Sequence, residues 1–391
     1  MTHKRYIDDL LKARLSEENP LIQVVIGPRQ IGKTTAIKSF LSSSGDYHSA
    51  DSPTPLRFEE IQNWWSQALT KKKPLLAIDE VQKIQGWSEV IKKLWDGAII
   101  KPKLILSGSA ALTIEKNLKE TLAGRFELIR ANHWTFLEAQ NIFKMNLKEY
   151  IEFGCYPGSE RFRKDLDRWG EYVRDSIVEP AIGRDIMQLH PVENPALFRQ
   201  VFLLATQLPA QIVSLNKLQA QLQDRGAMAT IQHYLNLLNA GFLITGVQKF
   251  SESGFRAKAS PPKVIVHDNA LLRAFERPIS KKLTPSQFGH YFENSVGARF
   301  LEAGWNVSYW KDRSLEVYFI VNGPSGEKWS IEVKSAKVTK NELKGLSEFC
   351  KRNPDYEPCL ISFVDQKMDG IKSLSCKSIL SLDSNRISHG L

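Results

Sequence analysis

The chain has 391 residues, which predicts two or three domains because a single hydrophobic core rarely grows beyond ~250 residues. Apolar residues make up 42% of the chain and charged residues 25%, and no apolar stretch reaches the ~20 residues that a membrane-spanning helix needs. These values exclude an integral membrane protein. The net charge of +10 favours a polyanionic partner, of which nucleic acid is the commonest.

The amino-terminal residues predict an amphipathic helix and no secretion signal. Ile7, Leu11 and Leu15 recur at helical spacing among charged residues, and an apolar block with a cleavage site is missing. The four cysteines include no C-x-x-C pair, which argues against a zinc site or a disulfide framework. We therefore expect a cytoplasmic protein with reduced thiols.

A glycine-rich loop at residues 27–35 predicts a phosphate-binding site. It follows an almost wholly apolar run, residues 21–26, which is typical of a buried parallel strand, and it precedes a helical pattern. Backbone N–H groups at a helix N-terminus can cradle a triphosphate, with Lys33 on the β- and γ-phosphates and the Thr34 hydroxyl on Mg²⁺. The predicted ATP-binding residues are Gly27, Pro28, Arg29, Gln30, Ile31, Gly32, Lys33, Thr34 and Thr35.

Residues 74–80 form a second apolar run that ends in two carboxylates. We expect Asp79 to hold the Mg²⁺ through its water shell and Glu80 to polarise the attacking water. A strand that ends at a solvated acidic pair is the plain alternative, and the glycine loop makes it the weaker one.

A third apolar run, residues 103–109, ends in small hydroxyl residues. Ligands collect at the carboxyl ends of parallel strands, so Ser107 or Ser109 is a candidate sensor of the γ-phosphate. A simple turn at the end of the strand is an equally weighted alternative.

The strings GPRQIGKTT, LLAIDEVQKIQGW, LILSGSA and LAGRFELI occur in this order along the chain. Together they resemble the AAA+-related P-loop ATPases of prokaryotes that carry a lid, a winged helix and a restriction-endonuclease-like domain. The resemblance implies that Arg125 stabilises the charge of a γ-phosphate, in its own chain or in a neighbouring one. It also implies an α/β fold with four parts: an ATPase core with a parallel sheet flanked by helices in residues 1–140, a helical lid in 141–200, a winged helix in 201–278 and a restriction-endonuclease-like α/β domain in 279–391.

Residues 214–222 and 230–241 predict two short helices joined by a glycine-containing turn, followed by strands that would supply a wing. In a DNA-binding module the second helix would enter the major groove and basic residues would touch phosphates. The second helix carries no Lys or Arg, and a winged helix used only for packing is an equally weighted alternative. The candidate DNA contacts are Arg225, Arg256, Lys258 and Lys263.

The carboxy-terminal third outlines a PD-(D/E)XK-type nuclease. Such a site needs carboxylates that bind Mg²⁺ and a lysine that steadies the attacking water. Tyr318 stands where the resemblance expects a metal-binding Asp, and a neutral phenol is a poor Mg²⁺ ligand. We therefore expect a degenerate nuclease-like site without metal-dependent cleavage, whose members are Glu293, Glu316, Glu332 and Lys334.

The predicted function is an ATP-binding and ATP-hydrolysing molecular switch, with ATP and Mg²⁺ as cofactors. It would act on DNA or on a DNA-associated protein through the carboxy-terminal modules. Two alternatives stay open, an ATP-dependent nuclease and a protein-interaction ATPase that binds no DNA. No membrane partner is expected, and an oligomer stays open because the sequence identifies no interface.

Overall fold

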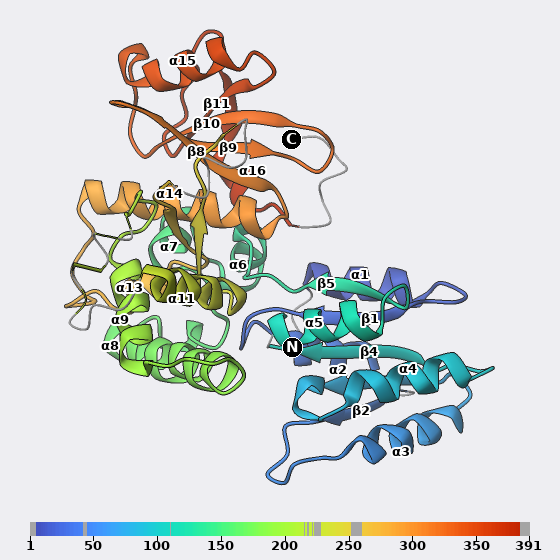
Figure 1. The fold of residues 1–391 in the computed structure, drawn as a ribbon. Helices are drawn as coiled ribbons and strands as arrows, with labels where there is room; N and C mark the ends of the chain where they lie inside the picture. Colours follow the sequence, from blue (N-terminus) through green and yellow to red (C-terminus); the bar gives the residue numbers. More distant parts are fainter. Residues whose placement is uncertain are drawn as a thin grey trace. The chain divides into compact units, whose positions relative to one another are not determined.

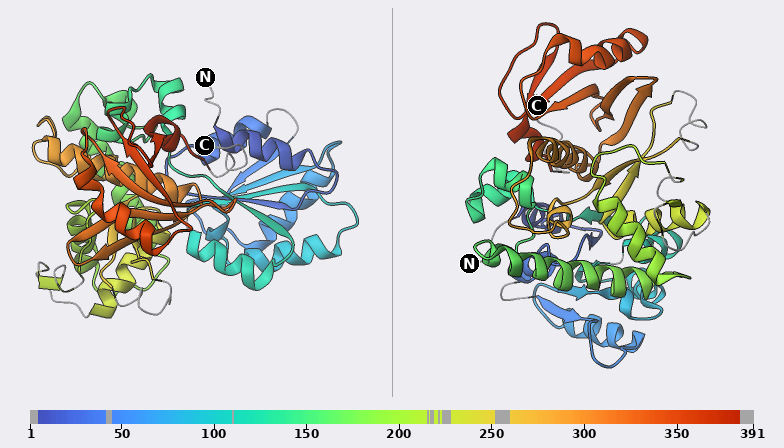
Figure 2. Two further views of the ribbon diagram at one scale, coloured as in Figure 1. Left: turned by 90° about the horizontal axis from the view of Figure 1, so that it is seen from above. Right: turned by 90° about the vertical axis from the view of Figure 1, so that its left-hand side faces the viewer.

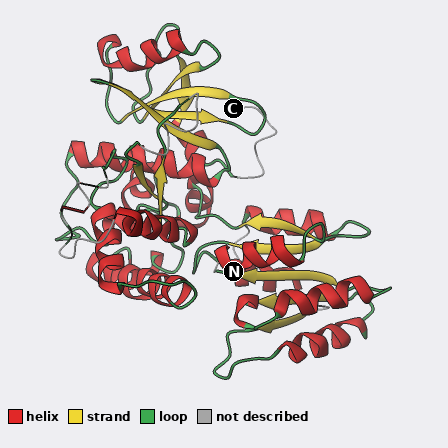
Figure 3. Ribbon diagram, in the orientation of Figure 1, coloured by secondary structure: helices red, strands yellow, loops and turns green. Residues whose placement is uncertain are grey.

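The computed structural model describes residues 5–383, apart from residues 42–44, 110, 215, 217, 218, 221, 223–227 and 252–259. The chain divides into two compact units, Met1–Asn132 and His133–Leu391. Figures 1 and 3 show that each unit contains its own sheet with helices around it. None of the described helices is both long enough and apolar enough to cross a membrane.

The first unit is built on a five-stranded parallel sheet in the order β2-β3-β4-β1-β5. Every residue of β1 is buried, as an apolar strand in the middle of a parallel sheet requires. Strand β4 lies between β1, which precedes the glycine loop, and β3, which leads to the two carboxylates. The strands are β1 (Ile22–Ile26), β2 (Asp46–Ser49), β3 (Leu75–Asp79), β4 (Lys103–Gly108) and β5 (Phe126–Arg130).

Helices cover both faces of this parallel sheet (Figure 2). The predicted amphipathic helix is present as α1, which buries Ile7, Leu11 and Leu15 and packs against α2. Helix α4 packs against α3 and α5. The helices are α1 (Tyr6–Leu15), α2 (Lys33–Leu41), α3 (Phe58–Leu69), the short η1 (Val81–Lys83), α4 (Trp87–Gly97) and α5 (Ala111–Thr121). The predicted α/β fold with a parallel sheet flanked by helices is thereby confirmed.

The second unit begins with a helical segment. Capping boxes at Thr135 and Asn146 start α6 and α7, since each side chain accepts a hydrogen bond from the backbone N–H three residues on. The segment contains α6 (Phe136–Phe143), α7 (Leu147–Phe153), η2 (Glu160–Phe162), α8 (Leu166–Glu171), the π-helical η3 (Tyr172–Val178) and η4 (Ala181–Met187), and α9 (Pro195–Thr206).

A helix and a hairpin follow this segment. Helix α11 (Met228–Ala240) packs on α9 and on β6, and β6 (Ile244–Val247) pairs antiparallel with β7 (Lys263–Val266). Four of the nine residues of the predicted first helix of the helix-turn-helix, and residues 252–259 of the predicted wing loop, lie outside the described residues. The described part therefore contains the second helix and the paired strands of the predicted winged helix.

The carboxy-terminal part of the second unit is a mixed sheet in the order β12-β11-β10-β9-β8. Strand β9 pairs antiparallel with both β8 and β10, whereas β10, β11 and β12 run parallel. Figure 1 shows α14 and α15 on opposite sides of this sheet. The elements are α13 (Ala270–Arg273), α14 (Pro285–Glu302), β8 (Asn306–Asp312), β9 (Leu315–Asn322), β10 (Lys328–Lys334), η5 (Lys340–Leu343), α15 (Lys344–Arg352), β11 (Glu357–Ser362), β12 (Lys372–Ser375) and α16 (Cys376–Leu380).

Candidate nucleotide site and carboxy-terminal acidic cavity

The glycine loop, residues 27–35, joins β1 to the start of α2, as the sequence predicts. Gly27 lies so close to the residue that follows β5 that an added Cβ would stand 2.1 Å from the carbonyl oxygen of Ala131. Gln30 and Gly32 both adopt positive φ angles, 58° and 97°, which turn the loop back toward the helix. The loop thus requires glycine at position 27 for space and favours it at position 32 for backbone conformation.

Lys33 is buried at the start of α2, with its ammonium folded onto the loop. Its Nζ donates to the carbonyl oxygens of Gly27 and Pro28 at 2.8 and 2.7 Å. Those carbonyls belong to the loop that would surround a phosphate. A phosphate oxygen would therefore compete with loop carbonyls for the same ammonium.

The carboxylate of Asp79 accepts hydrogen bonds from three hydroxyl groups. Thr34 and Ser107 donate at 2.6 Å and Tyr47 at 2.9 Å. The hydroxyl of Thr34 and the carboxylate of Asp79 are the hard oxygen ligands that Mg²⁺ prefers, so these residues fit the ion that the fold implies. When bound, Mg²⁺ would neutralise charge on the phosphate oxygens.

Tyr47 is a member of this site that the sequence analysis missed. It lies on β2, whose residues pair in parallel with β3, so its hydroxyl reaches the carboxylate at the end of the neighbouring strand. Burial and the negative charge of Asp79 raise the pKa of Tyr47 well above its usual value. The phenol therefore stays a hydrogen-bond donor at neutral pH.

Glu80 follows Asp79 in a left-handed conformation, with φ of 54°, which is uncommon for a residue with a side chain. Its Oε2 accepts hydrogen bonds from the side-chain amide of Gln82 at 2.6 Å and from the hydroxyl of Ser109 at 3.2 Å. Neutral donors from two directions thus hold the carboxylate predicted to polarise water. Ser109 lies beside the predicted base, and its role as a sensor of the γ-phosphate stays a prediction.

Arg5 is a second residue that the sequence analysis missed. It is buried, and its guanidinium donates to the carbonyl oxygens of Ile31 and Asn132 at 2.9 Å each. It therefore ties the glycine loop to the chain that leaves β5. No local signal marks it, because its partners lie far away in the sequence.

Arg125 lies at the opposite edge of the sheet from the glycine loop. Its carbonyl accepts a hydrogen bond from the N–H of Ile22, the first residue of β1, whereas the loop follows Ile26, the last. These two ends are roughly 13 Å apart at ~3.3 Å per residue. The guanidinium pairs with both carboxylate oxygens of Asp96 at 2.7 and 2.9 Å, and this hydrogen bonding raises the pKa of Arg125. In this structure Arg125 is thus directed away from the glycine loop of its own chain, and its role at a γ-phosphate stays a prediction.

The second unit contains a cavity of about 500 Å³ lined by Glu293, Glu316 and Glu332 together with Tyr318, and we call it the acidic cavity. The structure thus brings together the carboxylates that the sequence analysis assigned to a degenerate nuclease-like site. They come from α14, β9 and β10 respectively. The ammonium of Lys334 lies 2.9 Å from Glu332 Oε1 and 5.1 Å from the centre of the Tyr318 ring.

Burial is the largest influence on the pKa values of Glu332 and Tyr318 in this cavity. It raises the pKa of Glu332 to about 7, because the attraction of Lys334 offsets burial only in part and Glu293 adds repulsion. Burial, with the negative charges of Glu293 and Glu332, also raises the pKa of Tyr318 well above its usual value. The phenol at the position of the expected Asp is therefore neutral, and it hydrogen-bonds Glu293.

The expectation that Lys263 touches DNA is wrong. Its side chain is completely buried, and its Nζ lies 2.9 Å from Glu316 Oε1. It begins β7 as predicted, but all four residues of that strand are buried, and the ammonium pairs with a carboxylate that lines the acidic cavity. The other predicted DNA contacts, Arg225, Arg256 and Lys258, lie outside the described residues.

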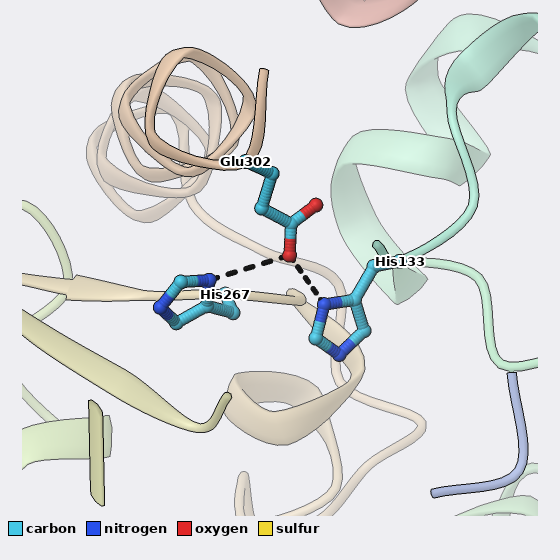
Figure 4. Close-up of side chains that lie close together, drawn as sticks. All are labelled: His133, His267 and Glu302. Atoms are coloured by element: carbon cyan, nitrogen blue, oxygen red, sulfur yellow. Dashed lines mark hydrogen bonds and ion pairs between the residues drawn. The ribbon is translucent and has the colours of Figure 1, made fainter. Parts of the chain in front are cut away.

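A separate polar cluster is buried in the second unit (Figure 4). The Nδ1 atoms of His133 and His267 lie 2.5 and 3.3 Å from the same oxygen, Oε1 of Glu302. Arg299 Nη2 lies 3.1 Å from the other oxygen. Burial opposes ionisation of Glu302, but His133 and Arg299 hold the pKa of its carboxyl well below the usual value. Three side chains of metal-ligand type meet here, yet Arg299 already balances the charge of the carboxylate, so the cluster acts as an internal link between segments.

Comparison with known protein families divides the chain in three. Residues 19–140 match the family described as AAA domain. Residues 144–282 and 288–379 match two families described as Domain of unknown function, DUF8612 and DUF4143. The first unit therefore contains an AAA-related P-loop ATPase domain, a fold that binds nucleotide.

Individual relatives resemble the chain over most of its length. An uncharacterized protein of Haemophilus influenzae is 23% identical over 348 residues, which cover 82% of this chain and 83% of the relative. One of Mycobacterium tuberculosis is 26% identical over 327 residues, which cover 80% of this chain and 70% of the relative. Among solved structures, a Walker-type ATPase of Pyrococcus abyssi matches at 14% identity with a TM-score of 0.45, over 70% of this chain and 95% of that one.

Proposed function

We propose that this chain is an ATP-binding and ATP-hydrolysing molecular switch that acts on DNA or on a DNA-associated protein through its second unit. The observation that carries the ATPase part is the meeting of Lys33, Thr34, Asp79 and Glu80 at the carboxyl ends of β1 and β3. In this proposal Lys33 binds the β- and γ-phosphates, Thr34 and Asp79 would hold Mg²⁺, and Glu80 polarises the attacking water.

The contacts of the loop support a switch as well as a binding site. Lys33 must exchange two loop carbonyls for phosphate oxygens when ATP enters, so the loop loses two internal hydrogen bonds. A cation between Thr34 and Asp79 would likewise open the 2.6 Å hydrogen bond that joins them. Asp79 also accepts from Tyr47 of β2, so nucleotide binding would alter contacts beyond the loop.

The target of the switch is proposed from charge. The net charge of +10 favours DNA, and a restriction-endonuclease-like identity of the carboxy-terminal part is supported by the element order α14-β8-β9-β10-α15-β11. Helix α11 exposes His233, Asn236 and Asn239, which offer little charge for phosphates. We therefore expect helix α11 to contribute little to the contacts with DNA phosphates.

The ATPase proposal is tested by measuring ATP affinity and turnover in the presence of Mg²⁺. Lys33→Ala removes a charge-assisted phosphate contact and a charge that stabilises the transition state, so we expect kcat/KM to fall by roughly 1000-fold or more. Lys116→Ala removes an exposed lysine of α5 and serves as the matched control. Equal kcat/KM in wild type and Lys33→Ala would exclude this loop as the catalytic nucleotide site.

The DNA part is tested separately, with a short duplex titrated over a range of salt concentrations. Neutralisation of phosphates makes the logarithm of affinity fall linearly with the logarithm of salt concentration. A duplex that does not bind at low salt would favour the alternative of an ATPase that acts on proteins alone, and it would leave the ATPase proposal intact.

A further inference from the structure

A buried lysine, Lys263, distinguishes the acidic cavity from a metal site. This lysine belongs to β7, which pairs with β6 and lies outside the sheet that supplies Glu316 and Glu332. Its ammonium is completely buried, 2.9 Å from Glu316 Oε1 and 4.6 Å from the centre of the Tyr318 ring. It therefore contacts Glu316 and also lies over the ring of Tyr318, the residue at the position of the expected Asp.

Four glutamates line the cavity, and three of them have a basic partner, whereas Glu342 accepts hydrogen bonds from Thr339. Glu316 pairs with Lys263 and Glu332 with Lys334, each at 2.9 Å, while His290 Nδ1 lies 3.5 Å from Glu293 Oε2. A divalent cation needs carboxylate oxygens that are free to bind it, and it is repelled by fixed positive charges nearby. Lys334 is the lysine that such a nuclease site itself requires. The buried ammonium of Lys263 on Glu316 and the phenol of Tyr318 are therefore the features that do not fit the Mg²⁺ ion that a nuclease fold implies.

We propose that the ammonium of Lys263 takes the place of the divalent cation in this cavity and makes it a metal-free ionic link between hairpin β6–β7 and the carboxy-terminal sheet. The inference is independent of nucleotide binding in the first unit. In this proposal two groups prevent the binding of a metal ion, the phenol of Tyr318 and the ammonium of Lys263. Restoring the carboxylate alone is then insufficient, because the ammonium still holds Glu316.

The test is Mn²⁺ binding to the full chain without nucleotide, measured by titration with electron paramagnetic resonance of free Mn²⁺. We expect wild type and Tyr318→Asp to bind the same number of ions. We expect Tyr318→Asp combined with Lys263→Met to bind one more, since methionine keeps an apolar stem and removes the charge. Adding Glu332→Gln to this pair should remove the extra ion.

Lys311 provides the matched control, because its Nζ also lies near Glu316, at 3.5 Å, but its side chain is about half exposed, at 47%. Tyr318→Asp with Lys311→Met should gain no ion. If the methionine variant fails to fold, Lys263→Gln supplies a second neutral side chain with a polar end. The proposal is overturned if Tyr318→Asp alone gains a Mn²⁺ ion, or if neither neutral replacement of Lys263 adds one to it.

Discussion

The nucleotide site and the acidic cavity both gather carboxylates on strands of a sheet, but they surround these carboxylates with different donors. Asp79 accepts from the neutral hydroxyls of Thr34, Tyr47 and Ser107. Glu316 and Glu332 instead contact the ammonium groups of Lys263 and Lys334. Neutral donors orient a carboxylate and leave its charge for a cation, whereas an ammonium cancels that charge. The chemistry of a carboxylate cluster therefore depends on its donors as much as on its acids.

The largest effect that would sharpen this comparison is expected at Glu80. Its carboxylate is held by Gln82 and Ser109, so Glu80→Gln should preserve the local contacts and remove the group that polarises water. We expect ATP binding to stay near the wild-type level and kcat to fall by about 100-fold or more. Single-turnover hydrolysis separates this loss from slow product release.

The control for Glu80→Gln is Glu120→Gln, at an exposed position of α5, which should leave kcat unchanged. If Glu80→Gln kept full turnover, the water would be activated elsewhere. The difference between a carboxylate held by neutral donors, such as Glu80, and one paired with an ammonium group, such as Glu316, would then not explain the activity.

A smaller effect is expected from the wing loop. Because Lys263 is buried, only two of the basic residues predicted for the wing remain candidate DNA contacts, Arg256 and Lys258. If the chain binds DNA, replacing both with Ala should weaken binding to all sequences. It should also reduce the salt slope by roughly two units, at ~0.9 per phosphate contact.

Lys263→Met separates the two roles considered for that lysine. Because Lys263 is buried against Glu316, its neutralisation should leave the salt slope of DNA binding unchanged. A reduction of about one unit in a folded Lys263→Met protein would restore its assignment as a phosphate contact. Binding is followed by fluorescence anisotropy of a labelled duplex.

The nucleotide site could be predicted from the sequence because most of its residues follow local rules. The glycine loop is continuous in sequence, and Asp79 and Glu80 end an apolar strand that the periodicity identifies. Tyr47 and Arg5 could not be predicted from the sequence. The contact of Tyr47 depends on the pairing of β2 with β3, and the partners of Arg5, Ile31 and Asn132, lie far from it in the sequence. The spacing of residues alone does not specify such long-range neighbours.

The acidic cavity shows a different limit. The acids on α14, β9 and β10 were grouped by the resemblance, and the structure brings them to one cavity. The sequence assigns Lys263 to DNA because the basic residues of a wing would touch phosphates. Only the tertiary packing of β7 buries that lysine and directs it to Glu316. The alternative of an active nuclease is accordingly the one that this geometry supports least.

The smallest expected effect concerns the pH dependence of the acidic cavity. Burial raises the pKa of Glu332 to about 7, above its reference value of 4.5. The folded protein therefore keeps a proton that the unfolded chain has lost, and the stability of this region should fall as pH rises from about 4.5 to 7. The full shift corresponds to at most about 3 kcal/mol.

Glu332→Gln should remove this pH dependence and lose the ion pair with Lys334 at the same time. We therefore expect a net gain on the order of 1 kcal/mol for the variant over wild type at pH 8, and no gain at pH 5. This difference in stability is measured by hydrogen exchange of the β10 amides, compared between the two proteins at the same pH. Glu357→Gln, at an exposed carboxylate of β11, is the control and should change little at either pH. A variant that is less protected than wild type at pH 8 would mean that Lys334 outweighs burial and that the cavity is fully neutralised by its ammonium groups.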